Sequence, residues 1–222
     1  MPRRPAPGIK PSVFDRGWRK VVCCASGPSF SMDQLRLLQD KLRLQAFGWH
    51  TIVVNTTWQR LPNADVLYAG DRAWWDHHLA SVQERFEGEL WTQDRWTAHH
   101  AGLHHIQHSD EPGLSRINGR VHSGGNSGYV ALGLAYLFGA REILLVGYDM
   151  QDTGGMAHWH GDHPPTLNQE RPYVRWLKAM PTLAEGLKDV GVQVVNCSIE
   201  TALLCFPRGD LESCLFKSDP SQ

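Results

Sequence analysis

Short apolar runs alternate with helical repeats of apolar residues along most of this chain. Residues 20–25 form an apolar run that ends in a Gly- and Pro-containing turn at 26–29, as a buried strand does. Ser31 and Gln34 then have the spacing of a capping box, and leucines recur after them at helical intervals. A second apolar run follows over 51–55. This order predicts a parallel strand–helix–strand unit.

The same pattern returns in the second half of the chain and extends the predicted sheet. The segments expected as strands are 20–25, 51–55, 64–69, 142–147 and 192–196. The predicted helices cover 31–47, 127–139 and 171–189. The pattern therefore predicts an α/β fold: one Rossmann-like, open and mainly parallel sheet with helices on both faces.

Two segments depart from this rhythm. Residues 1–17 are rich in proline and cations, so we expect a flexible basic tail there. Residues 72–112 carry several Trp and His side chains among charged residues, and we expect short helices and loops that form an insertion or lid. The remaining chain, 18–222, is predicted to form a single domain.

Composition narrows the classes of function. Hydrophobic residues make up 41% of the 222 residues, which excludes a disordered chain. Lys and Arg number 22 against 23 Asp and Glu, so the net charge of -1 predicts no global attraction to nucleic acid. The chain also has 12 His and 9 Trp, and histidines are useful in sites.

Cysteine usage and the absence of long apolar runs predict the compartment. No run approaches the roughly 20 apolar residues of a membrane span, and the Pro-rich start lacks the apolar core of a signal peptide. The five cysteines show no CxxC spacing, and Cys23, Cys24 and Cys197 lie in apolar runs where we expect buried thiols. We therefore expect a soluble, cytoplasmic protein.

Polar residues follow the predicted strands at the edge where parallel sheets bind ligands. The turn Ser26-Gly27-Pro28-Ser29 follows the first strand and can turn backbone N–H groups toward a phosphate, or be a plain strand-to-helix turn. Asn55 ends the second strand, and Asp71 and Asp149 follow two others. The turn is neither GxGxxG nor a Walker loop, so it predicts neither NAD nor P-loop chemistry.

A second loop that could bind a phosphate precedes the apolar helix at 127–139; we call this loop and the turn at 26–29 the two cradles. Gly124-Gly125 and the cap residues Asn126, Ser127 and Gly128 allow close approach of a ligand to free backbone N–H groups. The alternative is a flexible loop with an ordinary cap. Two cradles on one sheet favour a nucleotide ligand. We expect Asn55 and Ser127 to face one cleft, because both lie at the carboxyl edge of the same sheet.

The segment His158-Trp159-His160-Gly161-Asp162-His163 has the densest polar chemistry. Its imidazoles can hold a metal ion or act as a general base, and a solvated surface loop is the third alternative. We expect no tightly bound structural zinc, because alternating imidazoles should diverge along an extended loop and no cysteine is near. As candidate base we rank His163 first, since Gly161 frees the backbone before it, then His158, and His160 last.

These motifs together resemble a known family. Ala25-Ser26-Gly27-Pro28-Ser29 resembles the Gly-x-Gly-Pro-Ser nucleotide loop of the bacterial sialyltransferases of glycosyltransferase family 42 and of the related 6-hydroxymethylpterin diphosphokinase-like family. Asn55 matches the nucleotide-contacting Asn. Asn126-Ser127-Gly128 and residues 143–149 resemble the Ser-Gly, helix, Gly-x-x-Ile-x-Leu-x-Gly-x-Asp block. Residues 158–163 resemble the His-aromatic-x-Gly-His stretch with the catalytic base. The resemblance covers about 20–60 and 123–207.

The resemblance implies a Rossmann-like, nucleotide-binding transferase domain over 18–222. Its function would be transfer of a sugar from a nucleotide donor, for sialyltransferases a CMP-linked one, to an acceptor hydroxyl, without metal. Tyr148 and Tyr173 are candidates for the tyrosines that steady the leaving phosphate. The alternative is pyrophosphate transfer to a pterin-type hydroxymethyl group, with Mg²⁺ on Asp71 and Asp149. A non-catalytic binding module and a homo-oligomer both remain open.

Overall fold

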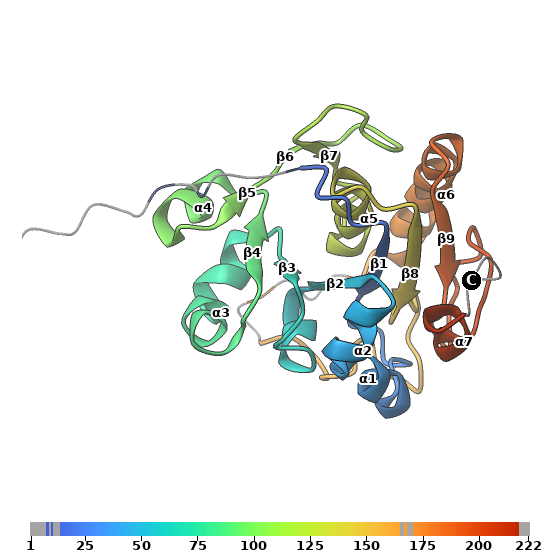
Figure 1. Ribbon diagram of the computed structural model, residues 1–222. Helices are drawn as coiled ribbons and strands as arrows, with labels where there is room; N and C mark the ends of the chain where they lie inside the picture. Colours follow the sequence, from blue (N-terminus) through green and yellow to red (C-terminus); the bar gives the residue numbers. More distant parts are fainter. Residues whose placement is uncertain (1–7, 9, 11–13, 165–166, 168–170, 218–222) are drawn as a thin grey trace, which may run out of the picture.

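The central sheet of the computed structural model is entirely parallel. The structure describes residues 8, 10, 14–164, 167 and 171–217, and in this part of the chain seven strands pair in the order β5-β4-β3-β2-β1-β8-β9 (Figure 1). The strands are β1 Lys20–Cys24, β2 Trp49–Val54, β3 Val66–Tyr68, β4 Glu89–Thr92, β5 His104–His105, β8 Glu142–Val146 and β9 Gln193–Asn196. The predicted α/β fold with a mainly parallel sheet is confirmed.

Helices cover both faces of this sheet. They are α1 Met32–Gln39, α2 Lys41–Ala46, α3 Arg72–Arg85, α4 Arg95–Ala101, α5 Ser127–Leu137, α6 Tyr173–Asp189 and α7 Leu211–Leu215, with a 3-10 helix η1 at Asn55–Gln59. Helices α5 and α6 pack on one face, and α1, α2, α3 and α7 pack on the other (Figure 1). Within the described residues, no helix combines the length and apolar character needed to cross a membrane.

The strands are apolar on both faces because both faces are covered. In β1, Val21 and Cys23 belong to the core beside α5, while Val22 and Cys24 belong to the core beside α1, and all four are fully buried. Helix α1 begins with the expected capping box at Ser31. The apolar runs therefore predicted these strands correctly.

The thiols behave as the sequence predicts. Cys23, Cys24 and Cys197 are buried and free, and burial raises the pKa of each thiol above its ordinary value. These thiols are therefore protonated at neutral pH and act as small apolar groups in the core.

Strand β1 lies at the point where the strand order reverses. It pairs with β2 on one side and with β8 on the other, with Cys24 level with Val53 and Val146. In open α/β sheets a crevice forms beyond the carboxyl ends of the strands at such a point. The segments that follow β1 and β8 therefore face a common crevice.

The segment 72–112 differs from the expected insertion. It forms α3, β4, α4, β5 and β6 (Gln107–Ser109), and β4 and β5 extend the parallel sheet. Strand β6 pairs in parallel with β7 (Arg120–His122) in a separate two-stranded sheet. The expectation of helices and loops was wrong for the strands, because fully buried rings such as Trp91 stabilise strands too short for a clear apolar pattern.

The expected boundary of the N-terminal tail at residue 17 is also wrong. Arg16 forms an ion pair of 2.8 Å with Glu89, and the N–H groups of Asp15 and Arg16 donate to the end of α5. Phe14 packs against the core. Residues 14–17 therefore belong to the domain, while 1–7, 9 and 11–13 of the predicted tail lie outside the described residues.

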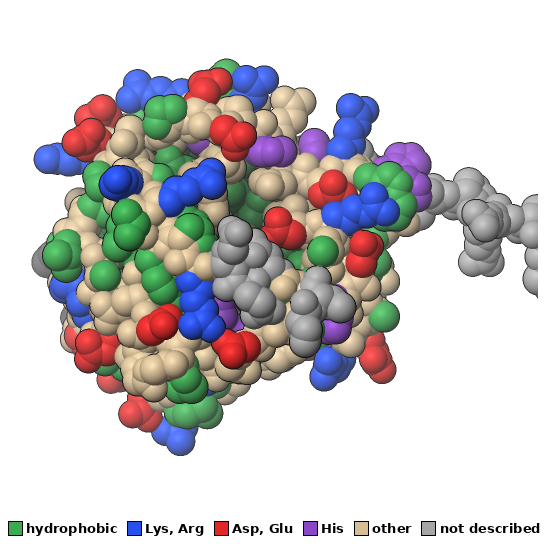
Figure 2. Space-filling view, turned by 180° about the vertical axis from the view of Figure 1, so that it is seen from behind, with side chains coloured by type: hydrophobic (Ala, Val, Ile, Leu, Met, Phe, Trp, Pro, Cys, Tyr) green, Lys and Arg blue, Asp and Glu red, His purple; other side chains and the backbone are tan. Residues whose placement is uncertain are grey.

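Charged side chains of both signs are intermixed on the surface. Figure 2 shows Lys and Arg beside Asp and Glu over the face opposite to the view of Figure 1. This distribution agrees with the net charge of -1.

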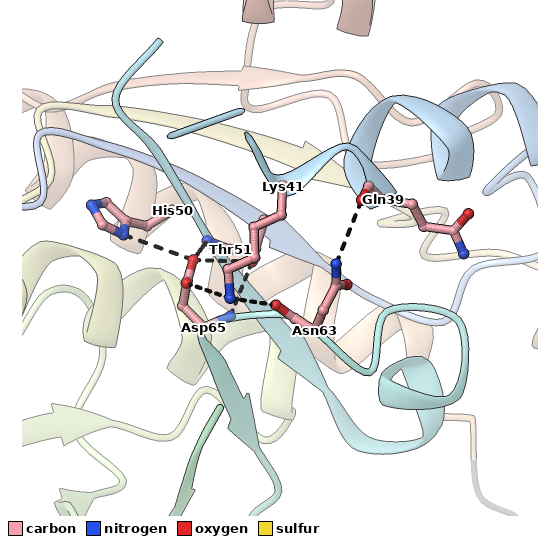
Figure 3. Close-up of polar contacts among 6 residues, drawn as sticks. All are labelled: Gln39, Lys41, His50, Thr51, Asn63 and Asp65. Atoms are coloured by element: carbon pink, nitrogen blue, oxygen red, sulfur yellow. Dashed lines mark hydrogen bonds and ion pairs between the residues drawn. The ribbon is translucent and has the colours of Figure 1, made fainter. Parts of the chain in front are cut away.

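A carboxylate ties β2 to β3 at their amino-terminal ends (Figure 3). Asp65 accepts hydrogen bonds from the N–H and hydroxyl of Thr51 at 2.8 and 3.2 Å, and its own N–H donates back to that hydroxyl. Lys41 lies 3.3 Å from the carboxylate and also donates to the carbonyl of Asn63. Burial raises the pKa of Asp65, but the His50 imidazole, the Thr51 N–H and the Lys41 charge outweigh it and lower the pKa.

We predict that Asp65→Ala destabilises the fold by about 1–3 kcal/mol at pH 7, because it leaves the Thr51 N–H without its acceptor. The folded pKa of Asp65 lies below the unfolded value of about 4, so its contribution is complete above that pH and disappears as the pH falls through the folded pKa. Urea denaturation between pH 3 and 7 measures this. Asp33→Ala, at an exposed carboxylate paired with Arg36, is the control and should change little. Equal stability of the two variants at pH 7 would contradict the assigned role.

Candidate functional site

A cavity of about 100 Å³ lies beyond the carboxyl ends of β1 and β8. It collects most of the residues predicted for the site: Ser26, Gly27, Asn55, Asn126, Ser127, Gly128, Tyr148, Asp149 and His158. The hydroxyl of Ser127 donates to the Asn55 side chain at 3.3 Å, although 72 positions separate them. The predicted meeting of Asn55 and Ser127 in one cleft is therefore confirmed.

Two further cavities adjoin the first one. A cavity of about 190 Å³ is lined by Asn55, Asp71 and His163, and another of about 210 Å³ by Asp71, Ser127 and Arg175. Asn55 and Ser127 each line two of the three cavities. Figure 2 shows a hollow on this side of the molecule with cationic side chains beside it. The three cavities are therefore neighbours that share lining residues at the strand ends.

The first predicted cradle turns its donors inward. The N–H of Gly27 donates to Gly147 O at 2.8 Å, and the N–H and hydroxyl of Ser29 donate to Asp149 at 2.9 and 2.7 Å. Pro28 has no N–H. Pro28 and Ser29 also do not line the cavity. Both Ser29 donors thus point to the carboxylate of Asp149 and not into this cavity, so the structure gives no support to the expected contact of Ser29 with a ligand.

Asp149 holds this loop in place at close range. A side chain on Gly27 would put its Cβ 2.1 Å from Asp149 Oδ1, so only glycine fits there. The second carboxylate oxygen also accepts from the Thr153 hydroxyl at 3.0 Å. Burial raises the pKa of Asp149, opposed in part by the hydrogen bonds from Ser29. Asp149 is thus a structural link between the ends of β1 and β8.

The second predicted cradle keeps its donors free. Asn126 caps α5 by accepting the N–H of Tyr129 at 2.8 Å, so the N–H groups of Ser127 and Gly128 have no acceptor within the helix. Both residues line the first cavity. The positive end of the helix dipole lies at the same place. The α5 N-terminus therefore has the unpaired backbone donors and the dipole orientation that suit an anion.

The two candidate tyrosines have different positions. Tyr148 is fully buried and donates its hydroxyl to Gly128 O at 3.0 Å, so it does not reach a ligand through that hydroxyl. Tyr173 lines the cavity and donates to Asp152 at 2.9 Å; burial, with the Asp152 carboxylate, raises its pKa to about 12. Tyr173 therefore remains available for contact with a ligand through its ring.

The sequence did not single out Trp176. This residue lines the first cavity beside Tyr173, with the two ring centroids 5.6 Å apart, and its indole N–H donates to Gly125 O at 2.8 Å. The signal that would have found it is the i, i+3 spacing of two aromatic residues on α6, which puts both rings on one helix face. Together they give the cavity an aromatic wall.

Two non-glycine residues beside the cavity have left-handed backbone conformations. Asn55 has φ 48° and Met150 has φ 52°, and both line the first cavity. Asparagine tolerates this region, whereas methionine adopts it at a cost in conformational energy. Strained positions of this kind cluster at functional sites, which agrees with the placement of the cavity.

The three imidazoles of the loop after β8 lie together rather than apart. One ring nitrogen of each of His158, His160 and His163 can be chosen so that all three lie within 4.8 Å of one another. The rings of His158 and His160 stack with centroids 5.0 Å apart. The expected divergence along an extended loop is wrong, because the chain forms a turn in which Gly161 N–H donates to His158 O.

Only one of these imidazoles borders the first cavity. Nδ1 of His158 lies 2.9 Å from the Ser26 hydroxyl oxygen, and His158 lines the cavity. His163 lines the second cavity with Asp71, and His160 lies beside both rings without lining any of the three. Figure 1 shows this loop, gold to orange, on its way from β8 toward α3.

Burial keeps these imidazoles neutral. Burial, together with the neighbouring imidazoles, lowers the pKa of His158 to about 4 and that of His160 to about 3. The pKa of His163 is also lowered, chiefly by burial. Each ring therefore has one unprotonated nitrogen at neutral pH, which a general base and a metal ligand both require.

Comparison with known proteins identifies neither a family nor a related fold for this chain. No protein-family model and no curated protein matches the chain. Among solved structures it has a weak similarity to a beta-N-acetylhexosaminidase from Bacteroides fragilis NCTC 9343, with 12% sequence identity and a TM-score of 0.24. The similarity covers 82% of this chain and 41% of the hexosaminidase chain. A TM-score this low does not indicate a shared fold.

Proposed function

We propose that this protein is a nucleotide-dependent transferase, and specifically a sialyltransferase-like glycosyltransferase that transfers a sugar to an acceptor hydroxyl. The observation that supports it most is the composition of one cavity. The free N–H groups of Ser127 and Gly128, the Asn55 amide and the His158 imidazole all border it. Phosphate, nucleoside and a reacting hydroxyl thus each have a suitable group within one crevice.

The donor lies along the strand ends in this proposal. Its phosphate accepts hydrogen bonds from the N–H groups of Ser127 and Gly128, where the α5 dipole favours negative charge. Asn55, held by the Ser127 hydroxyl, contacts the nucleoside. The rings of Tyr173 and Trp176 offer apolar faces against which a base or sugar can pack.

His158 is the base in this mechanism, in place of the first-ranked His163. The Ser26 hydroxyl holds Nδ1, which leaves Nε2 to accept the proton of the acceptor hydroxyl. The acceptor oxygen forms a bond to the anomeric carbon while the bond from that carbon to the donor phosphate oxygen breaks. The negative charge gained by the leaving nucleotide is stabilised by the N–H groups at the start of α5.

The Mg²⁺-dependent diphosphokinase alternative has less support. It needs both Asp71 and Asp149 as ligands, and both oxygens of Asp149 already accept hydrogen bonds from Ser29 or Thr153. Asp71 borders the second and third cavities rather than the first. The non-catalytic module remains as the outcome in which no nucleotide binds.

We predict that cytidine nucleotides raise the melting temperature, and that Ser127→Pro lowers their affinity about 10- to 100-fold. Proline fits the first position of a helix and removes the N–H as well as the hydroxyl, and the extended backbone of Asn126 tolerates a following proline. Ser127→Ala keeps the N–H and should lose much less. Thermal shift and calorimetric titration with CMP, UMP and ATP with Mg²⁺ measure this. Stabilisation by ATP with Mg²⁺ alone, or equal losses in both variants, would contradict the proposal.

A second prediction concerns His158. Once a donor and an acceptor are identified, His158→Ala should lower kcat by about 10²–10⁴ and leave the affinity for the nucleotide nearly unchanged, because a base acts on the acceptor in the transition state. Steady-state kinetics and nucleotide titration measure the two quantities. His100→Ala, at an exposed imidazole on α4, is the matched control. Full activity of His158→Ala would remove this residue from the mechanism.

A further inference from the structure

The proposed transferase needs one imidazole as base, but the loop after β8 brings three together. His158, His160 and His163 each offer a ring nitrogen within 4.8 Å of the others, and all three rings are partly buried. Three nitrogen donors that converge on one point in a partly buried loop form an arrangement that a single positive ion can bind.

We propose that His158, His160 and His163 form a binding site for one divalent transition-metal ion, with Zn²⁺ as the best-fitting ion. Three imidazoles leave one position of a tetrahedral ion open for water or another ligand. A set of nitrogen donors without carboxylates suits Zn²⁺, Co²⁺ or Ni²⁺ and does not suit Mg²⁺. No CxxC pair or carboxylate ligand is needed.

The backbone already holds the three donors close to the required geometry. Nitrogens bound to one tetrahedral Zn²⁺ at about 2.0–2.1 Å are about 3.4 Å apart, so small side-chain rotations from the 4.8 Å spread suffice. The turn is fixed by the Gly161 N–H to His158 O bond of 3.1 Å and by the Trp159 N–H to Ser26 O bond of 3.0 Å. Gly161 has φ 81°, which permits this turn.

The groups around the rings fit a metal site. The Ser26 hydroxyl lies against Nδ1 of His158, which orients the ring and leaves Nε2 for the ion. Nε2 of His160 is buried and has no hydrogen-bond partner among the described residues. Nε2 of His78, on the facing helix α3, has none either, and its charge interacts with that of His163. The His160 nitrogen is therefore open to an additional partner such as a metal ion or water.

Two cations, Arg171 and Arg60, lie near the loop, and their charges lower the pKa of His158 and His160 respectively. The guanidinium of Arg171 forms ion pairs with Asp152 and Asp162, which offset its charge. The guanidinium of Arg60 lies over the Trp159 ring, 4.1 Å from its centroid. Because two carboxylates face the single charge of Arg171, one net negative charge remains in these ion pairs beside the loop.

A metal ion and the proton of the acceptor hydroxyl would compete for the same nitrogen of His158. A metal ion bound to Nε2 of His158 would take the lone pair that accepts the proton, so the ion would inhibit transfer; this consequence alone rests on the proposed function. The binding itself rests on the three rings. The two ideas therefore fail separately: Zn²⁺ binding without nucleotide binding supports the metal site and removes the transferase, and nucleotide binding without Zn²⁺ binding overturns the metal site.

The test uses untagged full-length protein freed of metal with a chelator. Zn²⁺ is titrated in competition with a chromophoric chelator, and Co²⁺ is added separately to read the visible absorption of a tetrahedral ion. We expect about one ion per chain, with no competition by Mg²⁺. His160→Ala and the more conservative His160→Gln should each weaken Zn²⁺ binding at least about tenfold while keeping a cooperative melting curve. His160 is chosen because it borders none of the three cavities.

The matched control is His99→Ala, which removes an exposed imidazole on α4 outside the loop. It should bind Zn²⁺ as tightly as the wild type. Absence of stoichiometric Zn²⁺ binding would overturn the proposal. So would equal weakening by His99→Ala and His160→Gln, since it would mean that surface histidines bind the ion.

Discussion

The buried carboxylate of Asp149 is the interaction on which the site depends. One of its oxygens accepts the Ser29 hydroxyl, and the other accepts the Ser29 N–H and the Thr153 hydroxyl. These bonds join the segment after β1 to the segment after β8 at the reversal of strand order, and they leave no space for a side chain on Gly27. Because the first loop uses its donors for this link, the start of α5 is left as the place where an anion can bind.

Much of this arrangement follows from local sequence pattern. The central strands are apolar on both faces, so β1 and β8 were predictable as buried parallel strands, and the meeting of Asn55 with Ser127 followed from their common sheet edge. Strand β4 was not predictable, because its stability comes from the burial of Trp91 against distant parts of the chain. The sequence also could not predict that the Ser29 donors point inward, since their acceptor, Asp149, lies 120 positions away.

The histidine loop shows how burial sets chemistry. An extended chain would have kept the imidazoles apart, but the turn at Gly161 stacks them and removes water from their surroundings. Burial lowers the pKa of each ring and keeps one of its nitrogens unprotonated at neutral pH. The same property suits a general base and a metal ligand, so the proposed transfer and the proposed metal site are two uses of one set of lone pairs.

The central claim is that the start of α5, and not the loop after β1, binds the phosphate of a nucleotide. Backbone amide resonances followed during titration with CMP test it most directly, because they report each N–H separately. The account predicts large shifts for Ser127 and Gly128 and small shifts for Gly27 and Ser29, whose N–H groups donate inside the protein. Large shifts at Gly27 and Ser29 with none at Ser127 and Gly128 would contradict it.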